Sequence, residues 1–214
     1  MIYVLSPPDA LPPFDKVIRV CNHPIVTAFQ VRLKGASPST MAQAVRAVQT
    51  LCRGQNVALI LNDDPLLAKA LRCDGVHVGE DDTSVALARS QMGPGALIGA
   101  SCYDDLTLAM RAKEEGASYV AFGSVYPTTT KQAKTRAPLS VFQAWQGPQK
   151  NAPPLPSVGI GGISLDTVPQ VLDAGATAVA LCSGIWSDVD KALGQMDALM
   201  NRYGDQRWTL TPTT

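Results

Sequence analysis

The sequence has no excess of charge of either sign. It holds 18 basic and 18 acidic side chains, which cancel to a formal net charge of +0 at pH 7. Such a protein has no overall field to draw it onto nucleic acid or an anionic membrane. We therefore expect neither as a partner and predict that the protein acts on small molecules.

Paired cysteines are also lacking. The chain has 5 cysteines, an odd number, and none of them belongs to a Cys-x-x-Cys pair. This spacing argues against a disulfide framework and against a zinc cluster, and it favours a reducing compartment. We expect the protein in the cytoplasm.

The first residues lack the basic region of a signal peptide. The apolar run that starts at Met1 ends at Pro7 and Pro8. A run of this length neither spans a membrane nor forms the apolar part of a signal peptide, so we expect it to form a first strand.

The chain is long enough to bury one substantial core. Its 214 residues, 46% of them hydrophobic, are few for two ordinary domains. We predict one catalytic domain over residues 1–203, with a homo-oligomer left open. Residues 204–214 would form a tail that is polar apart from Trp208 and Leu210, free to fray or to dock.

Eight short apolar runs recur along the chain, as is typical of buried parallel strands. They cover Ile2–Leu5, Ala28–Leu33, Val57–Leu61, Gly75–Val78, Leu97–Ala100, Tyr119–Phe122, Ser157–Ile160 and Ala178–Leu181. Segments with helical spacing separate most of them: Thr40–Cys52, Ser84–Gln91, Asp105–Glu115, Asp166–Asp173 and Asp188–Tyr203. Gly116 and Gly175 follow two of these segments, where glycine commonly ends a helix.

This alternation predicts an α/β fold, a closed (β/α)8 TIM barrel. A doubly wound open sheet has the same local pattern and remains the alternative. The active site of such a barrel forms at the C-terminal ends of its strands, so the polar residues after each apolar run are the candidates.

Three polar residues alternate at the end of the second run. Gln30, Arg32 and Lys34 point to one side of the chain, and Val31 and Leu33 point to the other. A solvated strand end would explain them, but inward-facing Gln and Arg side chains need partners, which an anionic substrate supplies. The pattern favours an anion site.

Acidic residues follow the third and fourth runs. Asn62, Asp63 and Asp64 come after one, and Asp82 ends the segment that follows the other. Adjacent strands lie roughly 4.8 Å apart, so carboxylates from both can reach one Mg²⁺ ion. Any single Asp here could equally cap a helix.

Phosphate-binding residue types follow the last three runs. Thr128, Thr130 and Lys131 lie in a loop after the sixth run, and glycines including Gly162 follow the seventh. Ser183 follows the eighth run and precedes a further glycine. Backbone N–H groups at such positions commonly hold a phosphate, although a polar loop and tight turns would explain them as well.

Three other reactive residues are expected to be structural. His77 lies inside an apolar strand, and Cys102 and Cys182 have no histidine near them in the sequence. A thiol without an activating neighbour behaves as a small apolar side chain.

The ordered set of these motifs resembles the thiamine phosphate synthase family from Tyr3 to about Ile185. The family's Gln-x-Arg-x-Lys segment, Asn-Asp pair and Asp-Gly-x-His-x-Gly run are all present. By this resemblance, pyrimidine diphosphate would bind to Gln30, Arg32, Lys34, Asn62, Ser101 and Lys131. Thiazole phosphate would bind to Thr128, Thr130, Gly162, Cys182 and Ser183, and Mg²⁺ would bind to Asp63 and Asp82.

The resemblance also implies a reaction. Hydroxymethylpyrimidine diphosphate would lose diphosphate by ionisation, and the thiazole nitrogen would capture the cation to give thiamine phosphate. Lys131, Arg32 and Ser101 would be the catalytic residues, and no general base is required. Such a step needs cations and a metal on the leaving group and a water-poor pocket.

Three positions depart from the family pattern. Tyr103 stands where histidine is frequent, Ser124 where proline is common, and Cys182 where an aliphatic residue is usual. A related branch, the thiazole tautomerases, relies on a histidine at the position of Tyr103. Two alternatives stay open, an isomerase on the same barrel, including that tautomerase, and a catalytically silent ligand-binding barrel.

Overall fold

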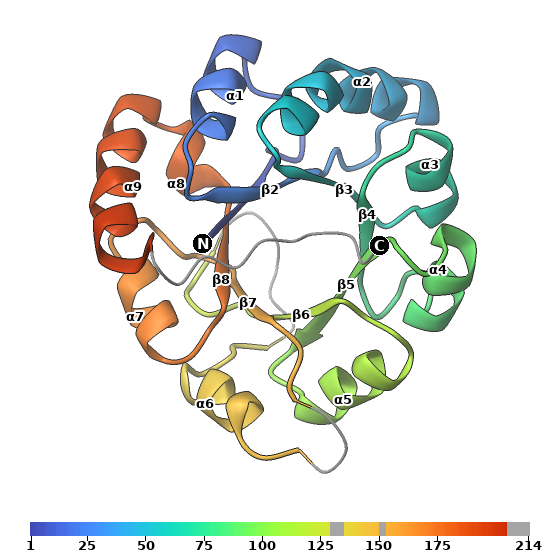
Figure 1. Cartoon of the computed structure of the whole chain (residues 1–214), viewed down its shortest axis with the longest axis vertical. Coiled ribbons are helices and arrows are strands. Elements are labelled where there is room, and N and C mark those ends of the chain that lie inside the picture. The colour runs from blue at the N-terminus through green and yellow to red at the C-terminus, as the bar shows by residue number, and fades with distance from the viewer. Residues whose placement is uncertain (129–134, 150–152, 205–214) are drawn as a thin grey trace.

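A closed barrel of parallel strands forms the centre of the computed structural model (Figure 1), which describes residues 1–128, 135–149 and 153–204. Neighbouring strands pair in sequence order, and β1 closes the ring by pairing with β8. The strands are β1 (Ile2–Leu5), β2 (Val26–Val31), β3 (Ala58–Asn62), β4 (Gly75–Val78), β5 (Leu97–Tyr103), β6 (Tyr119–Phe122), β7 (Ser157–Ile160) and β8 (Ala178–Leu181). The predicted barrel is confirmed, and the open sheet is excluded.

Helices cover the outside of this barrel (Figure 1). They are α1 (Phe14–Cys21), α2 (Pro38–Gly54), α3 (Pro65–Ala70), α4 (Val85–Met92), α5 (Leu106–Glu114), α6 (Ser140–Gln146), α7 (Val168–Asp173), α8 (Ser183–Trp186) and α9 (Val189–Tyr203). The sequence pattern did not predict α1, α3, α6 or α8. Each has 8 residues or fewer, which leaves little room for helical periodicity. The α4 and α7 helices are equally short but were predicted.

The second strand is the one that the sequence misplaces most. It was expected over Ala28–Leu33, but β2 starts two residues earlier, at Val26. Thr27 interrupts the apolar run, yet it is only 6% exposed. The strand ends before Arg32 because the Arg32 N–H donates to Ser6 Oγ at 2.8 Å instead of to a neighbouring strand.

Two layers of apolar side chains hold the fold together. The larger one lies between the strands and the helices. In it, the Phe122 ring of β6 lies 5.8 Å from both the Phe142 and the Trp145 rings of α6, edge to face. Truncating one such buried ring to alanine typically costs about 3–5 kcal/mol. The packing therefore explains why α6 docks despite its length.

The smaller layer fills the inside of the barrel. Small side chains such as Ala28, Ala58 and Ala178 surround two buried tyrosines, Tyr3 and Tyr119. Side chains thus fill the inside of the barrel, as in other barrels of this class.

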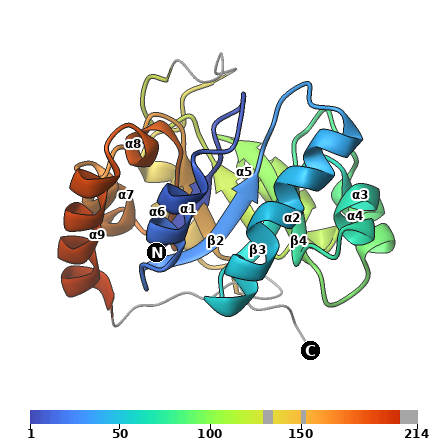
Figure 2. The same ribbon diagram turned by 90° about the horizontal axis from the view of Figure 1, so that it is seen from above.

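The N-terminus lies at one end of the barrel, and β2 points toward the other end. In the side view, the head of the β2 arrow lies at the opposite end from the N-terminus (Figure 2).

No helix within residues 1–128, 135–149 and 153–204 is long and apolar enough to cross a membrane. Of the predicted tail, residues 205–214 lie outside the described part of the chain.

Candidate functional site

A pocket of about 210 Å³ opens at the C-terminal ends of the strands. Every predicted site residue that the structure describes lines it: Gln30, Arg32, Lys34, Asn62, Asp63, Asp82, Ser101, Thr128, Gly162, Cys182 and Ser183. The other two predicted residues, Thr130 and Lys131, lie outside the described residues. The sequence thus predicted which side chains would share a cavity, and their roles stay predictions.

One side of the pocket is cationic. The segment after β2 keeps its alternation because its backbone is tied to the chain that follows β1. The Arg32 N–H donates to Ser6 Oγ and the Lys34 N–H donates to Pro8 O, each at 2.8 Å. Arg32 and Lys34 therefore stay in line with Gln30 beyond the end of the strand.

Two carboxylates lie beside these cations. Lys34 Nζ is 2.8 Å from Asp63 Oδ2, and Asp82 Oδ2 accepts the Gly79 N–H at 2.9 Å. Burial raises the pKa of Asp82, and so does the neighbouring Asp63, whereas the Gly79 N–H and Lys34 oppose the shift. The two carboxylates are thus close enough to repel each other, which is the arrangement expected of a shared cation site.

Two other aspartates near this pair accept hydrogen bonds from the backbone. Asp64 caps α3 by accepting the Leu67 N–H at 2.9 Å. Asp74 accepts the Leu59 N–H at 2.8 Å, before the start of β4. Asp64 and Asp74 therefore bond the backbone and are absent from the pocket lining, so Asp63 and Asp82 are the pair that reaches it.

The opposite side of the pocket is made of backbone. Gly161 and Gly162 have φ of 94° and 65°, in the left-handed region that favours glycine. A Cβ at Gly162 would lie 2.4 Å from Pro127 O, so a side chain is excluded there. Next to them α8 starts at Ser183, and the Cys182 side chain does not cap it. Bare N–H groups at such a helix start attract anions.

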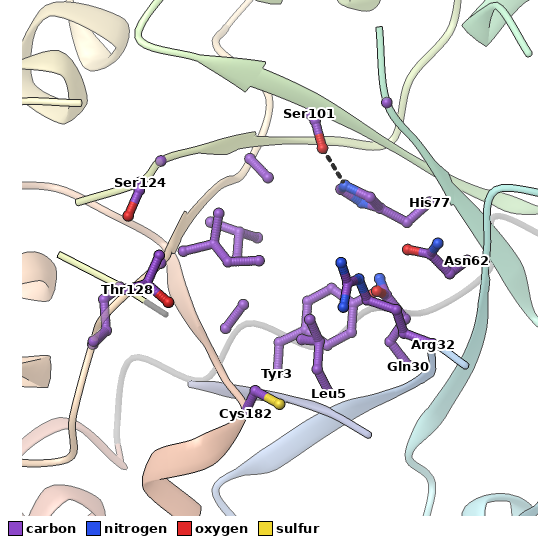
Figure 3. Close-up of a pocket in the computed structure, with 18 of the residues that line it drawn as sticks. Tyr3, Leu5, Gln30, Arg32, Asn62, His77, Ser101, Ser124, Thr128 and Cys182 are labelled. Atoms are coloured by element: carbon purple, nitrogen blue, oxygen red, sulfur yellow. Dashed lines mark hydrogen bonds between the residues drawn. The ribbon is translucent and has the colours of Figure 1, made fainter. Parts of the chain in front are cut away.

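Figure 3 shows the two sides facing each other across the cavity. Gln30, Arg32 and Asn62 lie together, while Ser124 and Thr128 lie across the cavity from them. Apolar side chains, among them Leu5, Val158 and Ile160, complete the wall. A ligand with an anion at each end and an uncharged middle fits this distribution.

The two cysteines behave differently. Cys102 is fully buried, and burial raises the pKa of its thiol to about 12. It is a small core side chain, as expected. Cys182 lines the pocket, and burial raises the pKa of its thiol as well, with Arg32 opposing. A protonated thiol is a poor nucleophile, so we expect Cys182 to form part of the pocket wall without reacting.

Sequence reasoning left four polar residues of the pocket out of the predicted site: Tyr3, His77, Tyr103 and Ser124. His77 was expected to be structural, and it also lines the pocket, where its Nε2 lies 2.9 Å from Ser101 Oγ (Figure 3). It pairs in register with Asn62, so the alternation that turns Asn62 into the pocket turns His77 there too. His77 lies two residues before Gly79, which also lines the pocket. In a strand, residues two apart point to the same side, so this spacing was the signal that could have placed His77 in the pocket.

Comparison with known proteins identifies the relatives of the chain. A family model described as thiamine monophosphate synthase matches residues 2–185. A thiamine-phosphate synthase of Rhodospirillum centenum is 44% identical over 162 residues, covering 76% of each chain. Another from Methylobacillus flagellatus is 42% identical over 176 residues, covering 81% of this chain and 82% of its own.

The fold of a solved structure agrees with these relatives. Thiamine phosphate pyrophosphorylase from Pyrococcus furiosus superposes with a TM-score of 0.80 at 28% identity, covering 94% of this chain and 95% of its own. Sequence and structure thus lead to the same conclusion: the chain belongs to the thiamine monophosphate synthase family of transferase enzymes.

Proposed function

We propose that the protein condenses hydroxymethylpyrimidine diphosphate with thiazole phosphate, forming thiamine phosphate and releasing diphosphate. The observation that carries this proposal is the two-sided pocket. Cations and carboxylates after β2, β3 and β4 face a glycine-lined backbone site after β7 and β8. Two phosphorylated substrates need two such anion sites with an apolar space between them.

The cationic side suits the diphosphate. Arg32 offers a planar fork of N–H donors and Lys34 a point charge, the two ways in which proteins hold phosphate oxygens. Asn62 adds an amide at the end of β3. Lys131 is assigned here by resemblance, and it lies outside the described residues.

Asp63 and Asp82 fit a Mg²⁺ ion. Two carboxylates from adjacent strands are the usual protein contribution to such a site, and water and phosphate oxygens supply the rest. Burial, and after it the neighbouring Asp63, raises the pKa of Asp82, and a divalent cation bound between the two carboxylates would favour their charged forms. Bound there, the ion supplies positive charge to the diphosphate.

The backbone side suits the thiazole phosphate. Gly162 and the first residues of α8 present N–H groups, and the hydroxyls of Ser183 and Thr128 lie on the same pocket wall. This division keeps the two phosphorylated groups apart. The reacting carbon and nitrogen then meet in the middle of the pocket, beside Ser101.

The proposed reaction needs no general base. The bond between the pyrimidine methylene carbon and the diphosphate oxygen breaks, and its electron pair leaves with the oxygen. The lone pair of the thiazole nitrogen then forms the new bond to that carbon. Arg32 and Lys34 stabilise the leaving oxygens, and the wall of Leu5, Val158 and Ile160 excludes water that would capture the cation.

The pocket also gives a reason to test a second function. His77 lines the pocket with an imidazole, a group that a phosphate-binding isomerase on the same barrel would use as a base. Such an enzyme would convert one substrate alone and release no diphosphate.

The five cysteines are all free within the described part of the chain. This fits a reducing compartment, and we keep the cytoplasm as the proposed location. Small molecules remain the proposed partners.

One assay tests the proposal. Purified protein is mixed with both substrates and Mg²⁺, and thiamine phosphate is measured by chromatography, with each substrate omitted in turn. Product is expected only in the complete mixture, and EDTA should abolish it. Conversion of thiazole phosphate alone would support the isomerase instead, and no conversion in any mixture would contradict both.

A further inference from the structure

A line of buried hydrogen bonds crosses the floor of the pocket. Gln30 Nε2 donates to the Tyr3 hydroxyl at 2.7 Å, and the Tyr3 and Tyr119 oxygens are 2.9 Å apart. The Tyr119 hydroxyl is 3.1 Å from His77 Nδ1, and His77 Nε2 is 2.9 Å from Ser101 Oγ. These residues come from five different strands, and the proposed condensation involves only Ser101 among them.

The line is built into the barrel. Gln30, Tyr3, Tyr119 and His77 are 3%, 2%, 0% and 8% exposed. A Cβ on Gly99 would lie 2.1 Å from Tyr119 Cζ and 2.5 Å from His77 Nδ1. Only glycine on β5 leaves room for this contact, so the tyrosine and the imidazole are held together by the backbone around them.

The donors in this line run in one direction. An amide nitrogen can only donate, so Tyr3 accepts from Gln30. Burial raises the pKa of both tyrosines, so each keeps its proton. Among the described residues, the hydrogen-bond acceptor for the Tyr3 proton is the Tyr119 oxygen. The Tyr119 hydroxyl, which accepts from Tyr3, lies 3.1 Å from His77 Nδ1, and this geometry directs its proton to that nitrogen.

The direction decides the tautomer of His77. A neutral imidazole carries one proton, and the nitrogen that accepts a hydrogen bond is the one without it. With Nδ1 accepting from Tyr119, the proton sits on Nε2 and is donated to Ser101 Oγ. The Ser101 oxygen is thus occupied as an acceptor, and its own proton is turned toward the pocket.

We propose that Tyr3 and Tyr119 are positioning residues that hold His77 as the Nε2–H tautomer and present Ser101 to the ligand as a hydrogen-bond donor. A donor selects a ring nitrogen with a free lone pair, as an aminopyrimidine has. It rejects the oxo analogue, in which the amino group is replaced by oxygen, when the ring nitrogen that faces Ser101 is the one that carries hydrogen. This selection rests on the proposed function, whereas the tautomer does not.

The tautomer is measured on the ligand-free protein. The chain has 2 histidines, so ¹⁵N-histidine labelling gives two ring systems, and the His23→Gln variant assigns them. Long-range ¹H–¹⁵N spectra are recorded well above the ordinary imidazole pKa of about 6.5. We expect His77 protonated on Nε2. Protonation on Nδ1 would mean that the line runs in the opposite direction and would overturn the proposal.

Removing a hydroxyl from the line tests the role of the tyrosines. In Tyr119→Phe, the ring that fills the core is kept, but Nδ1 loses its donor, and we expect a mixture of both tautomers. Tyr3→Phe should shift the population in the same direction. Tyr203→Phe is the matched control, because its hydroxyl bonds Asp173 on the outside of the barrel. An unchanged tautomer in both Tyr119→Phe and Tyr3→Phe would refute the positioning role.

Binding tests the consequence for the ligand. Calorimetry compares the aminopyrimidine diphosphate with its oxo analogue, and the wild type should prefer the former. Tyr119→Phe should lower the ratio of the two Kd values by about tenfold, the scale of one hydrogen bond to a buried group. An equal ratio in both proteins would overturn the selection. The Nε2–H tautomer without binding of either pyrimidine would instead overturn the proposed function alone.

Discussion

The two sides of the pocket bind anions by different means. After β2, β3 and β4 the groups are charged side chains, with Lys34 and Asp63 already 2.8 Å apart. After β7 and β8 they are main-chain groups, at glycines whose φ angles of 94° and 65° few other residues adopt. A charged side can be weakened by removing one side chain, whereas a backbone side is weakened by changing the shape of the chain or by placing a like charge beside it.

Removing a carboxylate from the charged side should have the largest effect. Asp82→Asn keeps the shape but removes one charged oxygen donor, and we expect kcat to fall by about a thousandfold or more. The Tm should change little, because Asp82 is exposed and its carboxylate accepts the Gly79 N–H only three residues away.

Asp64→Asn is the matched control for that variant. It changes the next carboxylate along the chain from Asp63, one that caps α3, and it should leave kcat near the wild-type value. Turnover close to wild type in Asp82→Asn, or full activity in EDTA, would contradict the metal assignment.

Arg32→Ala should come next. Loss of one preorganised cation at a leaving group typically costs about a hundredfold in kcat, and the same scale is expected for Lys131→Ala. Arg32→Lys restores the charge without the planar fork and should recover part of the loss. Equal activity of the alanine and wild-type proteins in steady-state kinetics would remove Arg32 from the mechanism.

The backbone side is tested at Ser183 because Gly162 is unsuitable. Any side chain at Gly162 meets Pro127 O at 2.4 Å, so Gly162→Asp would disturb the loop as well as the charge. Ser183→Asp places a carboxylate at the start of α8, where the helix tolerates it. We expect thiazole phosphate to bind at least about tenfold more weakly by calorimetry, the scale of one lost charged contact.

Ser183→Asn, similar in size and uncharged, controls for bulk. Pyrimidine diphosphate should bind to all three proteins with a similar Kd, since its site lies across the cavity. Equal losses for both ligands in Ser183→Asp would show that the pocket is not divided.

The smallest effect is expected at Tyr103. No step of the reaction needs an acid or base there, so Tyr103→Phe should keep kcat within about threefold of wild type, less than one hydrogen bond is worth. A loss of several hundredfold would indicate proton transfer and would revive the isomerase.

The sequence carried more information about the barrel than about its floor. Apolar runs and the polar residues after them predicted the closed fold and which side chains line the mouth. Tyr3 and Tyr119 each lie in one of those apolar runs, where the pattern predicts core residues. Alternation does not show that their two hydroxyls meet across the barrel. That contact joins residues 116 positions apart, and it depends on the space left by Gly99.

The short helices and β2 show the limits of local pattern. α3 is held by the Asp64 cap and by Pro65 at its start, features that mark a helix start but not its length. Thr27 shows the reverse, a polar residue that the sheet buries. In both cases tertiary contacts decide what periodicity cannot.

The stoichiometry of the reaction tests the account most directly. ³¹P NMR follows both substrates, diphosphate and thiamine phosphate together in one sample containing Mg²⁺. The two-sided pocket predicts that diphosphate and thiamine phosphate appear in equal amounts while both substrates are consumed. Diphosphate released without thiamine phosphate would mean that water captures the cation, and conversion of thiazole phosphate alone would mean a different enzyme; either result would contradict the account.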